Sequence, residues 1–251
     1  MTIMWNAVRE RIRRKELYIV VAIAVLLFLL FGSGDGSLTI NGEPVTGYES
    51  TFKILLVLAN AAGCVLSMVI SLKTIPKEYE TRTSHLVWIR GISQSWYHGE
   101  LVMANVAASI FADGILYLFL MGYTLILGTG DYFIRMIPAY LIFCINAVIV
   151  SMLVSVVSIR CPAWVTGLVG MMCVLAGIFH SVLNLYRNMV GGISGTALKW
   201  LLLIMPDLAG LQTQASNLIF GKEISVHEIL KGILIIYILS IGILVIRRRE
   251  A

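Results

Sequence analysis

Apolar residues along the chain gather into long runs that polar segments separate. The six runs are Leu17–Phe31, Ile54–Leu72, Leu101–Gly128, Met136–Ile159, Ala163–Leu185 and Ile229–Ile246. A helix needs about 20 mostly apolar residues to cross a bilayer, because it rises about 1.5 Å per residue through a hydrocarbon layer of about 30 Å. The first run is shorter than this and the third is longer, so flanking residues must extend the first, and the third must tilt or protrude. The pattern predicts six membrane-spanning helices.

The segment before the first run has an amphipathic pattern. In residues 1–15, apolar side chains recur at helical spacing opposite polar ones: Met4, Trp5, Val8 and Ile12 against Asn6, Arg9 and Arg13. This pattern predicts an amphipathic helix that lies on the inner membrane surface. A plain basic anchor with no mechanical role fits the same residues.

The segment 186–228, between the fifth and sixth runs, is apolar but interrupted. Its apolar stretch Trp200–Met205 is too short to cross a bilayer, and Pro206, Asp207 and Gly210 break the pattern that follows. We therefore expect an external re-entrant hairpin of two short helices, with Trp200, Pro206 and Asp207 in it. The alternative is a seventh span, which would move the arginines at positions 247–249 to the opposite side of the membrane.

Composition and charge support a membrane protein and assign its two sides. Of the 251 residues, 59% are hydrophobic and 13% are charged, and the mean hydropathy is +0.89. A soluble domain of this length needs more charge to cover its surface. Most of the 19 Lys and Arg residues lie before the first run, after the last, or in the segments that follow the second and fourth runs. The positive-inside rule makes that side cytoplasmic, so we expect a multi-pass protein of the inner (cytoplasmic) cell membrane with both termini in the cytoplasm.

The sequence lacks the patterns that would give the chain catalytic chemistry of its own. It contains no GxxxxGK[ST] phosphate loop, no HExxH and no GxSxG. The cysteines lie in or at the ends of apolar runs without CxxC spacing, as packing residues do: Cys64, Cys144, Cys161 and Cys173. The histidines are scattered, and His180, near the outer end of the fifth run, is expected to be neutral and either packed or hydrated. We therefore expect neither a metal site nor enzyme activity in this chain.

One acidic residue interrupts the third run. Asp113 lies about midway along it, where an ionised group is costly unless it is paired or hydrated. Asn105, Ser109, Asp113 and Tyr117 follow one another at four-residue steps and so form one polar stripe on the helix. The stripe is expected to face a neighbouring helix or a water-accessible cavity rather than lipid. Three roles are open: hydrogen bonds that fix helix packing, part of a substrate path, or proton coupling.

The segment 73–100, which we call the coupling loop, reads KTIPKEYETRTSHLVWIRGISQSWYHGE. Thr83 or Ser84 can cap the start of a short helix and Gly91 suits its end. Within that helix Leu86 and Ile89 would share one apolar face, with Trp88 beside it. An exposed apolar face in a charged cytoplasmic loop indicates either a protein-docking surface or a segment that lies on lipid.

The end of the coupling loop leads into the third span. Ser93 can cap this span, because a serine hydroxyl before a helix accepts a hydrogen bond from a free backbone N–H. Trp96 and Tyr97 follow, and we expect both at the level of the lipid headgroups, where amphipathic aromatic rings gather.

The order of these features resembles the permeases of the type-two ATP-binding-cassette exporter family. In that family the loop between spans two and three carries an acidic pair, a Gly-Thr, a short apolar helix, a break, a serine and a Gly-Lys. By resemblance, Glu78 and Glu80 match the acidic pair, Thr81 or Thr83 lies near the threonine, Leu86, Val87 and Ile89 match the apolar face, and Ser93 matches the serine. Arg82, Gly91 and Glu100 depart from the pattern at its glycine, its break and its lysine.

The resemblance extends over the whole chain and implies a fold. It implies an all-α integral membrane protein in which residues 1–251 form a single transmembrane permease domain. This domain would have six transmembrane helices, an N-terminal amphipathic interfacial helix, a cytoplasmic coupling helix between spans two and three, and an external re-entrant hairpin before span six. The stretch WLLLIMPDL would begin that hairpin.

The resemblance also implies partners. The coupling helix would insert into a groove of a separate ATP-binding-cassette ATPase subunit, through the residues Glu78, Glu80, Thr83, Leu86, Val87, Trp88, Ile89 and Arg90. ATP and Mg²⁺ would bind to that ATPase, and this chain would bind no cofactor. A second permease chain, identical or related, would complete the transport path in the lipid bilayer, and no nucleic acid is expected as a partner.

We therefore expect the permease subunit of an ATP-driven exporter in a bacterial cell. The spans are rich in Leu, Met and Phe, which favours a hydrophobic or amphipathic substrate. By resemblance this would be an antimicrobial or toxin peptide, with a drug or a lipid as alternatives. The rival readings are an ion-coupled secondary transporter that uses Asp113, which would predict internal repeats, and a non-transporting membrane scaffold.

Overall fold

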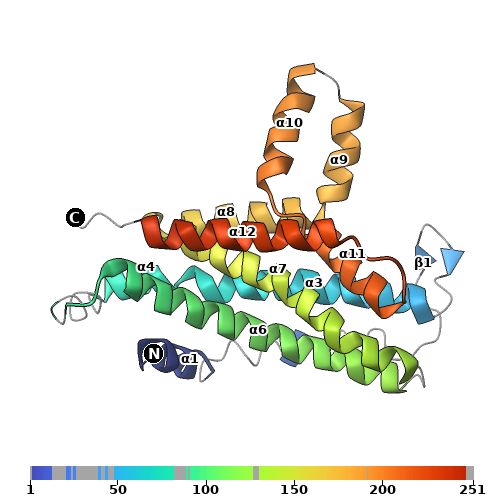
Figure 1. The fold of residues 1–251 in the computed structure, drawn as a ribbon, viewed down its shortest axis with the longest axis horizontal. Helices are drawn as coiled ribbons and strands as arrows, with labels where there is room; N and C mark the ends of the chain where they lie inside the picture. The colour runs from blue at the N-terminus through green and yellow to red at the C-terminus, as the bar shows by residue number, and fades with distance from the viewer. Residues whose placement is uncertain are drawn as a thin grey trace.

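The computed structural model describes residues 2–12, 21–23, 25–26, 39–40, 43–44, 48–81, 89, 91–126, 130–190 and 192–246. Within these residues the fold is a helical bundle with a projecting helical hairpin (Figure 1). The helices are α1 (Thr2–Ile12), α3 (Tyr48–Leu72), α4 (Thr74–Glu80), α6 (Gln94–Ile126), α7 (Phe133–Arg160), α8 (Ala163–Ile178), α9 (His180–Met189), α10 (Gly192–Ile204), α11 (Leu208–Ile219) and α12 (Val226–Val245). A 3₁₀ helix, η1 (Gly130–Tyr132), precedes α7.

Two short strands were not predicted. β1 (Thr39–Ile40) pairs antiparallel with β2 (Glu43–Pro44), so that Ile40 lies opposite Glu43. The sequence between the strands is Asn41-Gly42, which favours tight hairpins because both residues tolerate a positive φ. That signal was present in the sequence between the first two apolar runs.

Several described helices are long and apolar enough to cross a membrane. Four pass this test: Glu49–Glu80, Gln94–Ile126, Gly130–Arg160 and Val226–Val245, and α8 with α9 would make a fifth if the bent pair is one span. These helices are typical of a membrane-embedded all-helical protein. Most of the predicted first span, Leu17–Phe31, lies outside the described residues, although Ile23 packs against a buried cluster of α3 and α6.

The predicted fifth span, Ala163–Leu185, is not one straight helix. α8 and α9 are bent by 74° at Phe179. The segment that joins α10 to α11 packs against the end of α8, where a Cβ atom on Gly177 would lie 2.9 Å from the carbonyl oxygen of Pro206. The chain becomes amphipathic after Phe179, where α9 begins with His180 and Ser181. The predicted span ran across the bend because Val182, Leu183 and Leu185 extend the apolar run.

The helix α7 is the centre of the bundle. It packs against α3, α6, α11 and α12, and its fully buried side chains include Met136, Phe143 and Ile149. By contrast, α12 lies on the surface, and α9 and α10 project from the bundle as an antiparallel pair (Figure 1). The two short helices predicted within 186–228 do not form one hairpin together. Instead α10 pairs with α9 in the projecting hairpin, and α11 packs against the bundle.

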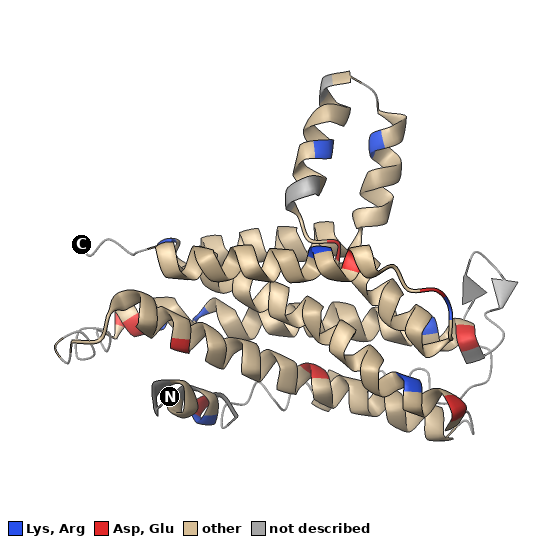
Figure 2. Ribbon diagram, in the orientation of Figure 1, with Lys and Arg blue, Asp and Glu red and all other residues tan. Residues whose placement is uncertain are grey.

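Charged residues lie mostly toward the two ends of the bundle, with fewer in its middle and on the projecting hairpin (Figure 2). At one end α1, α4 and the start of α6 lie together, and Ser95 Oγ donates a 3.0 Å hydrogen bond to the carbonyl of Leu244 near the end of α12. At the other end Glu49 accepts hydrogen bonds from Lys53 at 2.6 Å and Lys222 at 2.5 Å. The bond to Glu49 raises the pKa of Lys222, because the carboxylate favours the charged amine. The described residues of the coupling loop, the helix α1 and the C-terminal end of α12 therefore lie at one end of the bundle. The assignment of that end to the cytoplasm stays a prediction.

Candidate functional site

Hydrogen bonds between α4 and the start of α6 hold together the two ends of the coupling loop. Tyr97 Oη donates to Glu78 Oε2 at 2.7 Å. Gln94 Nε2 donates to Tyr79 Oη at 2.8 Å, and the Tyr79 hydroxyl lies 2.7 Å from Nε2 of His98. Because Tyr79 accepts from Gln94, its own proton is available to His98. We call these five side chains the loop clamp.

The loop clamp is built on a buried apolar base. Ile75 on α4 packs in one cluster with Tyr97, Leu101 and Ile159, and Ile75 is fully buried. His98 is also fully buried. The apolar cluster and the hydrogen bonds of the loop clamp together hold both ends of the coupling loop against α6 and α7.

The helix α1 attaches to the same region. The backbone N–H of Met4 donates to Glu100 Oε2 at 3.0 Å, and Lys77 Nζ lies 3.8 Å from Glu10 Oε1. A carboxylate at the first turn of a helix is favourable, because free N–H groups and the helix dipole both point there. Glu100, which departs from the family pattern, therefore has a structural partner in this chain.

Three of the predicted docking residues are described, and they differ in exposure and contacts. Glu78 is turned into the loop clamp, Glu80 is exposed, and Ile89 is 82% exposed. Thr83, Leu86, Val87, Trp88 and Arg90 lie outside the described residues. Gly91 has a φ of +77°, which suits a glycine at a helix end, although the helix it was predicted to end is not described.

The start of α6 follows the sequence reading in part. Ser93 Oγ accepts a hydrogen bond from the backbone N–H of Trp96 at 3.4 Å, as a capping serine does. Trp96 is 64% exposed, as expected at a headgroup level, but Tyr97 is buried. The hydroxyl of Tyr97 finds Glu78 inside the protein, and the headgroup level of Trp96 and Tyr97 stays a prediction.

The polar stripe on α6 is buried between α3 and α7. Asn105, Ser109, Asp113 and Tyr117 are each at most 2% exposed. Asn105 Nδ2 donates to Ser155 Oγ at 3.0 Å, and Asn105 Oδ1 accepts from Thr74 Oγ1 at 2.9 Å. Tyr117 Oη donates to the Met136 carbonyl at 2.8 Å. The two ends of the stripe thus join α6 to neighbouring helices.

The middle of the stripe differs from its ends. The carboxyl group of Asp113 lies against Gly63 of α3. Among the described residues, Asp113 Oδ1 and the hydroxyls of Ser109 and Ser67 have no hydrogen-bond partner. Ser67 lies one turn after Gly63 and Ser109 one turn before Asp113, so these oxygens follow the contact between the two helices. Asp113 is the described group whose burial most needs an explanation.

Sequence reasoning missed a second buried network. Asn146 Nδ2 on α7 donates to Asn60 Oδ1 on α3 at 2.8 Å and to the carbonyl of Leu208 at 3.0 Å. Ser71 and Ser151 are 2.8 Å apart on the same pair of helices. The signal was the presence of two asparagines inside long apolar runs, because buried amides in spans usually bond across helices.

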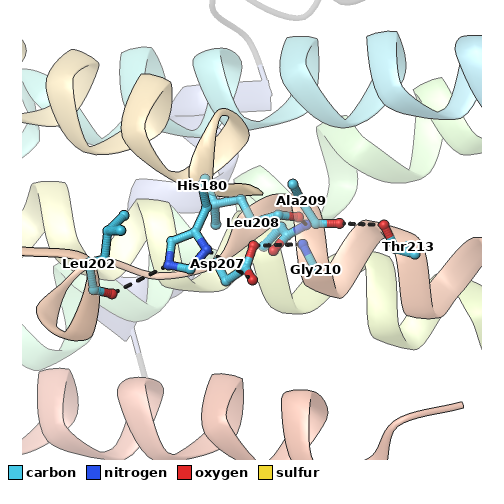
Figure 3. Close-up of polar contacts among 8 residues, drawn as sticks. His180, Leu202, Asp207, Leu208, Ala209, Gly210 and Thr213 are labelled. Carbon is cyan, nitrogen blue, oxygen red and sulfur yellow. Dashed lines mark hydrogen bonds and ion pairs between the residues drawn. The ribbon is translucent and has the colours of Figure 1, made fainter. Parts of the chain in front are cut away.

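The predicted re-entrant residues lie at the hairpin and its return. Trp200 is on α10 and is 63% exposed, whereas Pro206 and Asp207 join α10 to α11. Asp207 caps α11, because its Oδ1 accepts from the backbone N–H of Gly210 at 2.7 Å. Its Oδ2 lies 3.2 Å from Nδ1 of His180 (Figure 3). His180 was expected to be neutral, and an acidic partner for it was not predicted.

An apolar groove lies on α6 beside the stripe. It has a volume of about 480 Å³ and is lined by Ala107, Ile110, Phe111, Gly114, Ile115, Leu118 and Tyr140. Tyr140 Oη donates to the Ile110 carbonyl at 2.8 Å, so the tyrosine lies with its ring toward α6. In the described part of the chain, no group of three or more His, Cys, Asp or Glu side chains is arranged to hold a metal ion.

Comparisons with known proteins do not identify the chain. No known family model matches the sequence, and no curated protein matches it. The resemblance to exporter permeases therefore depends on the coupling loop and on the order of the elements along the chain.

Proposed function

We propose that this chain is the permease subunit of an ATP-driven exporter whose ATPase is a separate protein. The observation that carries the proposal is the loop clamp beneath an exposed apolar side chain. Ile89 is 82% exposed in the coupling loop, while Tyr97–Glu78 and Tyr79–His98 bonds fix both ends of that loop. Together with the apolar face that the sequence predicts at Leu86 and Ile89, a loop held at both ends in this way suits a protein partner that transmits force.

The loop clamp would transmit such a force from the coupling loop to the helices of the bundle. α4 follows α3 after a single residue, Lys73, and the hydrogen bond from Thr74 to Asn105 joins the start of α4 to α6. A displacement of the loop would therefore move α3 and α6 together rather than bend the loop alone. ATP-driven closure of two ATPase subunits would in this way change the access of the path, with ATP and Mg²⁺ bound on the ATPase.

The apolar groove on α6 supports a hydrophobic or amphipathic substrate. Its lining is aliphatic and aromatic apart from the Tyr140 hydroxyl, which already bonds to Ile110. Such a surface offers apolar contact and no fixed charge. An antimicrobial or toxin peptide remains the favoured substrate by family resemblance, with a drug or a lipid as alternatives, in a path completed by a second permease chain.

One observation favours a second candidate, an ion-coupled secondary transporter. Asp113 is 2% exposed and its Oδ1 has no hydrogen-bond partner among the described residues. Intramembrane carboxyl groups of this kind carry protons in many transporters. The two candidates differ in their energy source: the exporter depends on ATP, and the secondary transporter depends on an ion gradient and on the Asp113 carboxyl group.

The decisive experiment is purification of the tagged chain from its native membrane with any bound ATPase. We expect an ATPase to co-purify, and the double variant Leu86→Asp with Ile89→Asp to lose it together with ATP-dependent transport. The matched control is Val226→Asp, which adds the same acid at an apolar residue that is 64% exposed at the start of α12. If no ATPase binds, or if the loop variant and the control behave alike, the exporter proposal fails.

A further inference from the structure

His180 joins two parts of the chain at the base of the projecting hairpin. It is the first residue of α9, directly after the 74° bend from α8, and it is 8% exposed. Its Nδ1 lies 3.2 Å from Asp207 Oδ2, and its Nε2 lies 3.4 Å from the Leu202 carbonyl oxygen (Figure 3). The ring therefore lies between the end of α10 and the start of α11.

Both partners of the ring are hydrogen-bond acceptors. A carboxylate and a backbone carbonyl can each accept a hydrogen bond, but neither can donate one. A neutral imidazole carries one N–H and can satisfy only one of them, whereas a protonated imidazole carries two and can satisfy both. The geometry around His180 is therefore complementary to the protonated ring.

The charged groups nearby do not oppose a proton at this position. The acidic partner, Asp207, comes from the α10–α11 connection, and α11 itself carries no charged residue. The basic residues of the hairpin, Arg187 on α9 and Lys199 on α10, are two turns and nearly one turn away from the His180 contacts along their helices. The other titratable groups on the packed helices are Cys173 on α8 and Tyr186 on α9.

The expected depth of His180 and Asp207 in the bilayer favours an arrangement in which their charges cancel. α8 has 16 residues and so is about 24 Å long, which is less than the hydrocarbon thickness of about 30 Å. If α8 starts at the membrane surface, His180 and Asp207 lie within the bilayer. An isolated carboxylate there is unfavourable, but a carboxylate paired with a protonated histidine has no net charge.

The pair is mechanically connected to the core. Asp207 Oδ1 caps α11 through Gly210, so the same carboxyl group holds a helix start and the histidine. The next residue, Leu208, gives its carbonyl to Asn146 of α7, and Asn146 also bonds to Asn60 of α3. The position of His180 is thus transmitted to α7 and α3 through a short series of hydrogen bonds.

We propose that His180 is a reversible proton-binding site, and that its protonated form latches the α8–α9 bend to the start of α11. Loss of the proton removes one donor and the positive charge, so the hairpin base loosens when the ring is neutral. This makes the orientation of the α9–α10 hairpin dependent on pH, a property that the exporter proposal does not require.

The test is a distance measurement between the hairpin and the bundle. Spin labels are placed at Ala197→Cys on α10 and Leu234→Cys on α12, both exposed positions, with Cys161 and Cys173 replaced by serine. Cys64 and Cys144 are buried and stay in place. We expect a narrow distance distribution at about pH 5.5 and one at least about twofold broader at about pH 8.5, on either side of the histidine range.

Two variants separate the latch from the helix cap. Asp207→Asn keeps an oxygen that can accept from Gly210 but removes the charge, since asparagine caps helices as well as aspartate does. His180→Gln cannot take up a proton, and its two N–H donors share one nitrogen, so they cannot replace the two separate ring nitrogens. Both variants should give the broad distribution at both pH values, while His227→Gln, which changes the exposed histidine of α12, should keep the response.

A wild-type distribution that is the same at both pH values overturns the proposal, and so does a pH response that survives in His180→Gln. The wild-type series decides the question even if a variant fails to fold. Neither result depends on an ATPase, so the latch and the exporter function can fail separately.

Discussion

Gly63 on α3 lies directly against the carboxyl group of Asp113 on α6. A Cβ atom added at Gly63 would lie 2.9 Å from Asp113 Cγ and even nearer to Oδ1, which is closer than packed atoms can approach. The glycine therefore allows a buried acidic side chain to fit between two long helices. The size of the residue at 63 and the chemistry of the residue at 113 can be changed independently.

Gly63→Ala should destabilise the protein. The added methyl group must displace a buried carboxyl group or separate two helices, and overpacking of this kind costs about 1–3 kcal/mol. Thermal unfolding in detergent should show a lower Tm. Gly122→Ala on α6 is the matched control, because a Cβ atom there has no heavy atom within 4 Å, so alanine's greater helix propensity should leave its Tm equal or higher.

The double variant Gly63→Ala with Asp113→Ala tests whether the contact is the cause. Truncation of Asp113 creates room for the new methyl group, so the double variant should be more stable than the sum of the single effects predicts. Simple additivity of the two changes in Tm would show that the Gly63 effect has another origin.

Asp113→Asn should leave folding intact, with a Tm equal to or above that of the wild type. Asparagine has nearly the same shape, and the replaced carboxyl group is costly to bury while its Oδ1 has no hydrogen-bond partner in the described part of the chain. ATP-dependent transport should also persist if the exporter proposal is correct. Loss of transport with normal folding would instead favour the secondary transporter, which needs the titratable proton.

Tyr97→Phe should weaken the loop clamp without leaving a cavity in the apolar cluster. The ring stays in its apolar cluster, but Glu78 loses the 2.7 Å hydrogen bond from Tyr97. Loss of a hydrogen bond to a charged group destabilises by about 1.5–3 kcal/mol. Trypsin should therefore cut faster after Arg82 and Arg90 in the coupling loop, as followed by peptide mass. Tyr186→Phe changes an exposed tyrosine on the hairpin and should leave the rate unchanged; equal rates for both variants would count against the clamp.

The apolar runs predicted four of the long helices of the fold. The predicted spans Ile54–Leu72, Leu101–Gly128, Met136–Ile159 and Ile229–Ile246 correspond to α3, α6, α7 and α12, because a long apolar run has few alternatives to a helix. The bend at Phe179 escaped prediction because the apolar residues Val182, Leu183 and Leu185 of α9 continue the apolar run of α8 past His180 and Ser181. Hydropathy records how apolar a segment is and says nothing about the direction of its axis.

The candidate site was less accessible from the sequence, because its contacts join distant residues. The four-residue spacing placed Asn105, Ser109, Asp113 and Tyr117 on one face, as helical geometry requires. It could not show that Asp113 meets Gly63, or that Asp207 meets His180, since those pairs depend on how helices are arranged in space. Tyr97 shows the same limit: an amphipathic ring suits a headgroup region and a satisfied core equally well.

Asn146→Leu should be the most destabilising of these substitutions, because it leaves two buried acceptors without their donor. Asn146 Nδ2 is bonded to both Asn60 Oδ1 and the Leu208 carbonyl, and each buried group left unpaired costs about 1–3 kcal/mol. Ser151→Ala, which breaks one hydroxyl contact between the same helices, should cost less.

Adding Asn60→Leu to Asn146→Leu should recover part of the stability, since both partners are then apolar and only Leu208 remains unpaired. Because Leu208 follows Asp207, Asn146→Leu should also broaden the hairpin distance distribution at about pH 5.5, the lower pH of the distance measurement. An unchanged distribution would mean that the latch at His180 holds without support from α7.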